Sequence, residues 1–510
     1  MIASTPRASI VAPPRLTDPR LADTLGAPRS SAYRIAEHDT PSRRRERAAE
    51  LLARREQYVW QRDEGMPAWV AALPGEQRAD RRAIARAWGG FARPTRGLAA
   101  VRPGAVIPWA SAMDFDDAVD AAMPSGGGVL QRDDAFGRRR LARAGTMRLA
   151  AVRAPTVGAP LEAARWDGAL PATEVIAREA AAGNLYVCDY AALDGPRGGA
   201  DAETLSPIVL LHGRHDGLRP LAIRLTRGGD APWFTPADGR WPWVVAKAFV
   251  ECADARYHHV AVELYARGLW LAPFAIAARR QLHSSHPVYA LLAPHLDGVL
   301  ARCDAARAAL AEAAAAPRET TQGWAACVRR LHAESCWPDA LPRRVPLADA
   351  AFADADRARR ARIEAYVRDV VAIFYRGAAD VQIDHELQAF AADLAAPTGG
   401  AVAGFPARIT TVDALTEVLT AVIDHAMPAA GDASTAALAP RFPLALTAPP
   451  PRARADVDEA WLLRALPRRD VLAAQLAAVA ELARDAQGAG EVTWSDPDLA
   501  ARHAAFVQAW

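Results

Sequence analysis

Cysteines and clustered glycines are the residues of this chain whose local spacing could by itself indicate chemistry. The five cysteines are scattered and form no CxxC pair, so we expect reduced, mostly buried thiols and neither a disulfide framework nor a zinc site. Three consecutive glycines at 126–128 have neither the lysine nor the spacing of a phosphate-binding loop. Local spacing therefore identifies no reaction, and the larger pattern of the chain has to be considered.

The composition is that of a large globular protein with balanced charge. Of the 510 residues, 51% are hydrophobic and 24% are charged, and 61 basic residues nearly cancel 59 acidic ones to leave a net charge of +2. A nucleic-acid-binding protein would show a basic footprint instead. The N-terminus has no basic segment followed by an apolar one, and no uninterrupted apolar run of about 18 residues occurs. We predict no signal peptide, no transmembrane segment and a cytoplasmic location.

Three regions are expected along the chain. Residues 1–40 are rich in proline, serine and arginine and are predicted to form a flexible arm. Residues 41–130 are predicted to be a helical N-terminal region, with a helical pattern from Ser42 to Trp88 and again from Asp114. Residues 131–510 are expected to form the main domain.

The main domain is predicted to be mostly helical with a small sheet. From Trp243 onward the pattern is nearly all helix, and prolines at 273, 287 and 294 can each end a helix or occupy its first turn. The predicted fold class is therefore mainly α, with long helices and one antiparallel β-sheet. Three short apolar runs separated by turns predict the strands of that sheet: residues 185–190, 208–212 and 221–225.

Short motifs occur in one order through the main domain, and they carry a resemblance. They are DDAFG (133–137), DY (189–190), LRPLAI (218–223), WVVAKAFV (243–250), RQL (280–282), HP (286–287), LLAPH (291–295), YV (366–367), DHELQ (384–388), GFP (404–406) and LTEVLT (415–420). In these motifs the chain resembles the lipoxygenase family over roughly residues 130–510. It is similar to the compact bacterial members that lack the β-barrel lipid-docking (PLAT/C2-like) domain, and the resemblance implies the lipoxygenase catalytic-domain fold for residues 131–510.

The resemblance also implies a function. Lipoxygenases are non-haem-iron dioxygenases of polyunsaturated fatty acids, in which an iron(III) hydroxide removes a hydrogen atom from a bis-allylic carbon and dioxygen adds to the radical. The family holds its iron between two long helices through three histidines, often an asparagine, and the terminal carboxylate. The first two histidines are five residues apart, about 140° on a regular α-helix, and a π-type turn brings both to one face.

The ligand positions that the resemblance assigns are only partly filled in this sequence. His258 occupies the first, whereas Glu263 replaces the second histidine five residues later. The third falls on Ala430 when counted forward from Thr420, or on His425 when counted back from Pro440-Arg441-Phe442-Pro443. The asparagine position is correspondingly Ser434 or Ala429. The sequence ends at Trp510, and we expect the terminal carboxylate ligand to be missing.

Two interpretations of this altered site remain open. In one, His258, Glu263 and His425 form a two-histidine, one-carboxylate site of the kind used by iron(II) oxygenases, holding iron or manganese. In the other, no metal is bound, and Glu263 pairs with an arginine such as Arg256 or Arg267. The expected function is accordingly an oxygenase of fatty acids or other apolar small molecules. The alternative is a non-catalytic homologue that binds an apolar ligand or a protein partner.

Other residues are given structural roles. Arg138, Arg139 and Arg140 are predicted to form a solvated face. The histidines at 283, 286 and 295 belong to the family's structural pattern and are predicted to be hydrogen-bonded rather than metal ligands.

Overall fold

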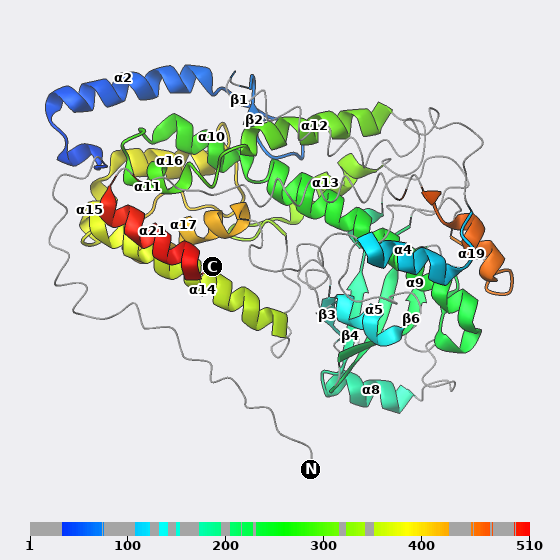
Figure 1. Ribbon diagram of the computed structural model, residues 1–510. Helices are drawn as coiled ribbons and strands as arrows, with labels where there is room; N and C mark the ends of the chain where they lie inside the picture. Colours follow the sequence, from blue (N-terminus) through cyan, green and yellow to red (C-terminus); the bar gives the residue numbers. More distant parts are fainter. Residues whose placement is uncertain are drawn as a thin grey trace, which may run out of the picture.

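The computed structural model of the chain describes residues 33–73, 75, 108–122, 132–140, 149–152, 173–194, 205–215, 217–227, 231–315, 323–341, 351–427, 450–451, 453–469, 472, 494 and 496–509. Within these residues the fold is mostly helical, with one five-stranded sheet and one short two-stranded sheet. The larger sheet lies at one end of the molecule and a group of packed helices at the other (Figure 1). The predicted mainly α fold class is confirmed.

The larger sheet contains the three strands expected from the sequence. Every neighbouring pair of its strands is antiparallel. A turn was predicted between the second and third of the expected runs, and Gly217 there has a φ of +121°, which residues with a side chain rarely adopt. The strand order is β3 (Leu149–Ala151), β4 (Leu185–Asp189), β5 (Ile208–Arg214), β6 (Gly217–Arg224) and β7 (Trp233–Phe234).

Both faces of this sheet are covered, which explains the continuous apolar run in its central strand. Successive side chains of a strand alternate between the two faces, yet Val209, Leu210 and Leu211 are all buried. Val209 and Leu211 join the main core. Leu210 belongs instead to a smaller apolar cluster with Ala180 of α8 (Thr173–Ala181). A strand buried on both sides shows no polar alternation in its sequence.

A 42-residue helical run, Arg240–Gln281, passes through the centre of the fold. It consists of α9 (Arg240–Tyr257), the π-helical segment η6 (His258–Leu269) and α10 (Ala272–Gln281). Its length and composition would allow it to cross a membrane, but 83% of its most apolar 18-residue window is buried inside the protein. A largely apolar helix that is enclosed in this way is a core helix.

The other helices surround this run (Figure 1). Against η6 pack α12 (Val299–Ala315) and α13 (Trp324–Glu334), and against α10 pack α2 (Pro41–Gln57) and α16 (His385–Ala395). Helix α14 (Ala351–Phe374) contacts both α17 (Val412–Ala426) and α21 (Pro497–Ala509). The remaining described helices are η1 (Ala36–His38), α4 (Ala112–Ala122), α5 (Asp133–Arg140), η4 (Ala191–Leu193), η5 (Pro236–Asp238), α11 (Pro287–Leu292), α15 (Ala378–Ile383) and α19 (Glu459–Ala465).

The helix predicted from Ser42 to Trp88 ends earlier than expected. Helix α2 stops at Gln57, and β1 (Trp60–Gln61) then pairs with β2 (Trp69–Val70). The reason is a tertiary contact, because Arg280 of α10 donates to the carbonyls of Arg55 and Tyr58 and so satisfies the end of the helix. Most of the segment from residue 74 to 88, and the glycines at 126–128, lie outside the described residues.

The last eight residues of the predicted arm, 33–40, pack against the protein. Ile35 is buried, and the backbone N–H of Arg34 donates to the carbonyl of Ser285 (3.0 Å). Residues 1–32 lie outside the described residues.

Candidate functional site

The π-helical segment η6 provides the spacing that the predicted metal ligands require. Hydrogen bonds in a π-helix join residues five apart, and the N–H of Trp270 donates to the carbonyl of Tyr265 over this spacing (2.7 Å). Side chains at positions i and i+5, which a regular α-helix would separate by about 140°, therefore share a face. The π-type turn implied by the resemblance is present in the structure.

His258 and Glu263 lie side by side at the start of η6. Nε2 of His258 and Oε1 of Glu263 are 3.6 Å apart, and the side chains are 16% and 13% exposed. Two ligand atoms that each lie about 2.0–2.2 Å from a metal ion can be at most about 4.4 Å from each other. The separation of this pair thus fits two donors to one ion.

An arginine on the next turn already binds the Glu263 carboxylate. Arg267 Nη1 donates to both carboxylate oxygens, at 3.0 and 3.1 Å. Burial acts to raise the pKa of Glu263, but the charges of Arg267 and His258, with the Arg267 hydrogen bond, outweigh it and hold this pKa below its ordinary value. Glu263 is therefore ionised at neutral pH, as a metal ligand must be. Of the two arginines proposed as its partner, Arg267 is the correct one.

His425, the third predicted ligand, lies near the end of α17. Its Nε2 donates to the carbonyl of Pro338 (2.9 Å), and its ring centroid is 4.7 Å from that of Trp270. Because a neutral imidazole carries one N–H, donation from Nε2 leaves Nδ1 as the atom with a lone pair. Trp270 is the C-cap residue of η6, so α17 approaches the π-helical segment at its far end.

The three predicted ligands do not form a complete metal site. In the part of the chain that the structure describes, no group of three or more His, Cys, Asp or Glu side chains is arranged to hold a metal ion. The structure brings His258 and Glu263 together but does not bring His425 into a three-donor group with them. Ala429, Ala430 and Ser434, which the other count selected, lie outside the described residues.

The neighbouring histidine, His259, faces a different helix. It is fully buried, and its ring lies edge-on against Trp324 of α13, with the centroids 4.9 Å apart. Burial lowers the pKa of His259 to about 3, and the charge of Glu263 offsets this only in part. His259 is therefore a neutral core residue at physiological pH.

The triple arginine at 138–140 is not a solvated face. Only Arg138 is exposed, whereas Arg140 is completely buried and forms ion pairs with Glu251 and Asp254 of α9. Arg139 also pairs with Glu251. The prediction failed because it took three adjacent charges as one surface, although neighbours on a helix point about 100° apart. Glu251 and Asp254, two acids in a largely apolar helix, were the signal that a buried basic partner exists.

The DDAFG motif packs α5 tightly against β6. A Cβ atom at Gly137 would lie 1.8 Å from the carbonyl oxygen of Leu218, so only glycine permits this approach. The first residue of the motif, Asp133, accepts hydrogen bonds from Trp243 Nε1 (2.9 Å) and Lys247 Nζ (2.8 Å) of α9. The motif therefore fixes the sheet end of the molecule to the helix that carries His258.

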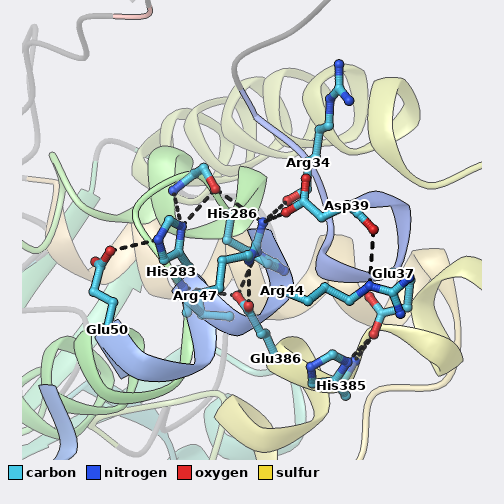
Figure 2. A network of polar contacts seen from close by, with 12 residues as sticks. Arg34, Glu37, Asp39, Arg44, Arg47, Glu50, His283, His286, His385 and Glu386 are labelled. Carbon is cyan, nitrogen blue, oxygen red and sulfur yellow. Dashed lines mark hydrogen bonds and ion pairs between the residues drawn. The ribbon is translucent and has the colours of Figure 1, made fainter. Parts of the chain in front are cut away.

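A second polar network joins α2 to the helices behind it, and Figure 2 shows it from close by. Arg47 of α2 donates to both oxygens of Glu386 (2.8 and 2.9 Å) and to Asp39 (2.8 Å). Glu386 also accepts the backbone N–H of His283 (3.0 Å). The DHELQ motif thus provides a buried carboxylate at the point where three chain segments meet.

Two of the three histidines with predicted structural roles are hydrogen-bonded. His283 Nε2 lies 2.7 Å from Glu50, and the buried His286 lies 3.0 Å from Asp384, which also accepts the Tyr375 hydroxyl (2.6 Å). His295 differs, since both of its ring nitrogens are enclosed without a hydrogen-bond partner in the described residues. Burial lowers the pKa of His295 to about 4, so it is a neutral core residue and the prediction of a hydrogen-bonded role was wrong for it.

Comparisons with known proteins support the family resemblance. Residues 202–323 match the family model described as Lipoxygenase. Human "Hydroperoxide isomerase ALOXE3" is 31% identical over 314 residues, which are 57% of this chain and 44% of that protein. The chain therefore spans less than half the length of this curated relative.

Solved structures show the same fold. Coral 8R-lipoxygenase matches with a TM-score of 0.72 and 22% identity, over 93% of this chain and 78% of that one. A manganese lipoxygenase matches with a TM-score of 0.68 and 18% identity, over 94% and 93% of the two chains. At these identities the structures establish the fold, and the site has to be judged from this chain's own residues.

Proposed function

Since this chain belongs to the lipoxygenase family, we propose that it is a dioxygenase of polyunsaturated fatty acids or similar apolar substrates. The observation that carries the proposal is the His258–Glu263 pair, which shares one face of a π-helical turn at the first two ligand positions of the resemblance. A histidine and a carboxylate are two of the three ligands in the two-histidine, one-carboxylate sites of iron(II) oxygenases. We propose His425 as the third.

The contacts of these residues support such a role. The ion pair with Arg267 keeps the Glu263 carboxylate ionised while no metal is bound. The hydrogen bond from His425 Nε2 to a backbone carbonyl is of the type that orients metal-binding histidines through their second nitrogen. For a complete site, Glu263 has to exchange Arg267 for the metal, and His425 has to approach the pair.

The proposed metal is iron or manganese, which would supply the redox chemistry that side chains lack. The chain's own contribution is to hold His258 and Glu263 on a helical run that is otherwise largely buried and apolar. Ala261, Leu264 and Trp270, all on or next to η6, are buried. An apolar substrate would therefore meet the donors in surroundings that match its own chemistry.

The test is metal content combined with oxygen uptake. The protein is purified without added metal or chelator, and iron and manganese per chain are measured for the wild type, His258→Ala and His259→Gln. The control is matched because His259 is the adjacent histidine but packs on Trp324. Oxygen uptake is then followed with linoleic acid and with stearic acid, which lacks a bis-allylic carbon.

The expected result is near-stoichiometric metal that is lost in His258→Ala and kept in His259→Gln, with oxygen uptake on linoleic acid alone. Protein that is empty and that refuses added iron(II) and manganese(II) would contradict the proposal. The alternative function, binding of an apolar ligand or a protein partner, would then take its place.

A further inference from the structure

Arg256 is a buried cation without an acidic partner among the described residues, and we propose that it binds the carboxylate of the fatty-acid substrate. This inference rests on the function proposed above and specifies how its substrate is oriented. Arg256 lies in the last turn of α9 and is 9% exposed. Across the ranges that the structure describes, its guanidinium has no hydrogen bond and no ion pair.

Every other buried arginine among the described residues has a hydrogen-bond or ion-pair partner. An unpaired charge in an apolar interior is costly, and the structure avoids this cost elsewhere. Arg279, which is about as buried as Arg256, donates to the carbonyl of Ala275 (3.3 Å). Arg256 therefore differs in lacking a partner, which a bound anion would provide. The remaining buried arginines pair with carboxylates: Arg47 with Asp39 and Glu386, Arg140 with Glu251 and Asp254, and Arg359 with Asp424.

The surroundings of Arg256 favour an anion with an apolar body. The groups that interact electrostatically with its guanidinium are the thiols of Cys252 and Cys327, on α9 and α13. Burial raises the pKa of the Cys327 thiol to about 12, so this thiol is uncharged at neutral pH. One positive charge between two helices with apolar side chains suits a monovalent carboxylate. A phosphate group would need more than one cation or several additional donors.

The guanidinium is partly accessible. Its Nε atom is wholly enclosed without a hydrogen-bond partner. The two terminal nitrogens, also without a partner in the described part of the chain, are not fully enclosed and reach the small exposed part of the residue. A carboxylate can bind these two nitrogens side by side, as arginine–carboxylate pairs commonly do.

Arg256 lies on a different side of the helix from the proposed metal ligands. It would therefore bind the substrate carboxylate at a distance from the carbon that reacts. Arg256 and His258 are two residues apart, so about 200° separates them around the helix axis. The carboxylate would thus lie on the α13 side of the helix, away from His258 and Glu263. A helix with its side chains is about 10–12 Å wide, and an unsaturated fatty-acid chain is long enough to pass around it. Arg256 is accordingly a substrate-positioning residue.

The experiment measures binding without turnover. Affinities of linoleic acid, linoleic acid methyl ester and sodium acetate are determined for the wild type, Arg256→Gln, Arg256→Lys and Arg138→Gln. Loss of one charge-assisted contact corresponds to roughly a 10- to 100-fold change in affinity. We expect Arg256→Gln to weaken binding of the acid by about this factor and to leave the ester unchanged. Arg256→Lys is expected to retain part of the preference for the acid, and the exposed Arg138→Gln to retain all of it.

Unfolding of the ligand-free protein provides a second readout. Because Arg256→Gln removes an unpaired buried charge and no ion pair, its melting temperature is expected to be equal to or above that of the wild type. A clear decrease would mean that Arg256 has a structural partner, which overturns the inference.

Several binding results would also overturn it. The first is a ratio of linoleic-acid affinity to methyl-ester affinity that Arg256→Gln leaves unchanged. The others are wild-type protein that does not bind linoleic acid, and acetate that binds as tightly as linoleic acid. The inference and the proposed function can fail separately. If the wild type takes up oxygen but Arg256→Gln leaves the acid-to-ester affinity ratio unchanged, only the carboxylate site is rejected. If the protein binds no metal but Arg256→Gln abolishes the preference for linoleic acid over its methyl ester, only the oxygenase function is rejected.

Discussion

Two polar regions of the molecule differ in how completely their charges are paired. At the junction of α2, α16 and the connection from α10 to α11, the buried Arg47 guanidinium binds the carboxylates of Asp39 and Glu386 (Figure 2). Glu386 also accepts the backbone N–H of His283.

At the start of η6, His258 Nε2 and Glu263 Oε1 lie 3.6 Å apart, and Arg267 binds the Glu263 carboxylate. Within the described residues no third donor completes this group. The first region is a finished structural network. The second has two donors in place and can still accept a ligand.

This difference indicates which buried charges support the fold and which can bind a ligand. Buried charges that only support the fold have to be fully compensated by the protein itself, because an uncompensated one costs several kcal/mol. A site that binds a metal or a substrate leaves part of this compensation to the ligand. The Arg256 guanidinium, which has no hydrogen bond or ion pair among the described residues, is therefore informative, whereas the complete network around Arg47 is structural.

The strongest test of the structural side is Arg47→Met. It leaves Asp39 and Glu386 buried without their shared cation, so we expect the free energy of unfolding to fall by about 3–5 kcal/mol. Chemical denaturation measures this value. Arg45→Met, an exposed position on the same helix, is the matched control and is expected to change the value by less than about 0.5 kcal/mol. Equal effects of the two substitutions would remove the contrast between the regions.

Acid should weaken the same network. Burial acts to raise the pKa of Asp384 and of Glu386, but His286 and Tyr375 at Asp384, and Arg47 at Glu386, outweigh it and lower both pKa values. A carboxyl group with a lowered folded-state pKa contributes stability above its unfolded pKa, about 3.9 for Asp and 4.3 for Glu, and loses it as pH falls through the folded value. The buried neutral histidines His259 and His295 also lower stability as pH falls below about 6.5, so the carboxylate contribution is measured as the difference in urea midpoint between the wild type and Asp384→Asn. This difference should stay constant from pH 7 to pH 5 and decrease below about pH 4.

Asp384→Asn provides the control for this pH dependence. The variant should be less stable at pH 7 and should lose less stability than the wild type between pH 4 and pH 2. A difference between the wild type and Asp384→Asn that decreases mainly between pH 7 and pH 5 would contradict the prediction.

On the side of the site, Arg267→Gln should make the Glu263 carboxylate easier to bind. If Arg267 competes with a metal for Glu263, its removal is expected to raise the affinity for added iron(II) or manganese(II) roughly tenfold, since one charge-assisted hydrogen bond contributes about 1.5–3 kcal/mol. Titration calorimetry under anaerobic conditions measures the change. Arg267→Gln combined with Glu263→Gln should lose the gain. Unchanged or weaker metal binding in the single variant would show that Glu263 is purely structural.

The smallest effect is expected at Arg138. Its side chain is 55% exposed and pairs with Asp134 at the surface, so Arg138→Ala should change the free energy of unfolding by less than about 1 kcal/mol. Arg140→Met, two positions further on, should cost several times more because Glu251 and Asp254 would lose a buried partner. Thermal unfolding of both variants checks this, and a large loss for Arg138→Ala would contradict the assignment of the exposed face.

By itself the sequence determined the fold class, the three central strands of the sheet and the long helices that follow Trp243, since these depend on local periodicity. The ordered motifs determined the family resemblance, and this resemblance implied a π-helical turn for the five-residue step from His258 to Glu263. Each of these features is encoded by residues close to one another in the chain.

Only the tertiary structure decided which charges are compensated. Arg140 and Arg138 are two residues apart, yet one is buried against α9 and the other faces solvent. In the sequence, Arg267 and Arg256 were equivalent candidates to pair with Glu263. In the folded chain Arg267 binds Glu263, whereas Arg256 lies beside α13. The end of α2 at Gln57 likewise depends on Arg280. The physical reason is that burial and ion pairing depend on which distant segments meet, and neither composition nor spacing records those contacts.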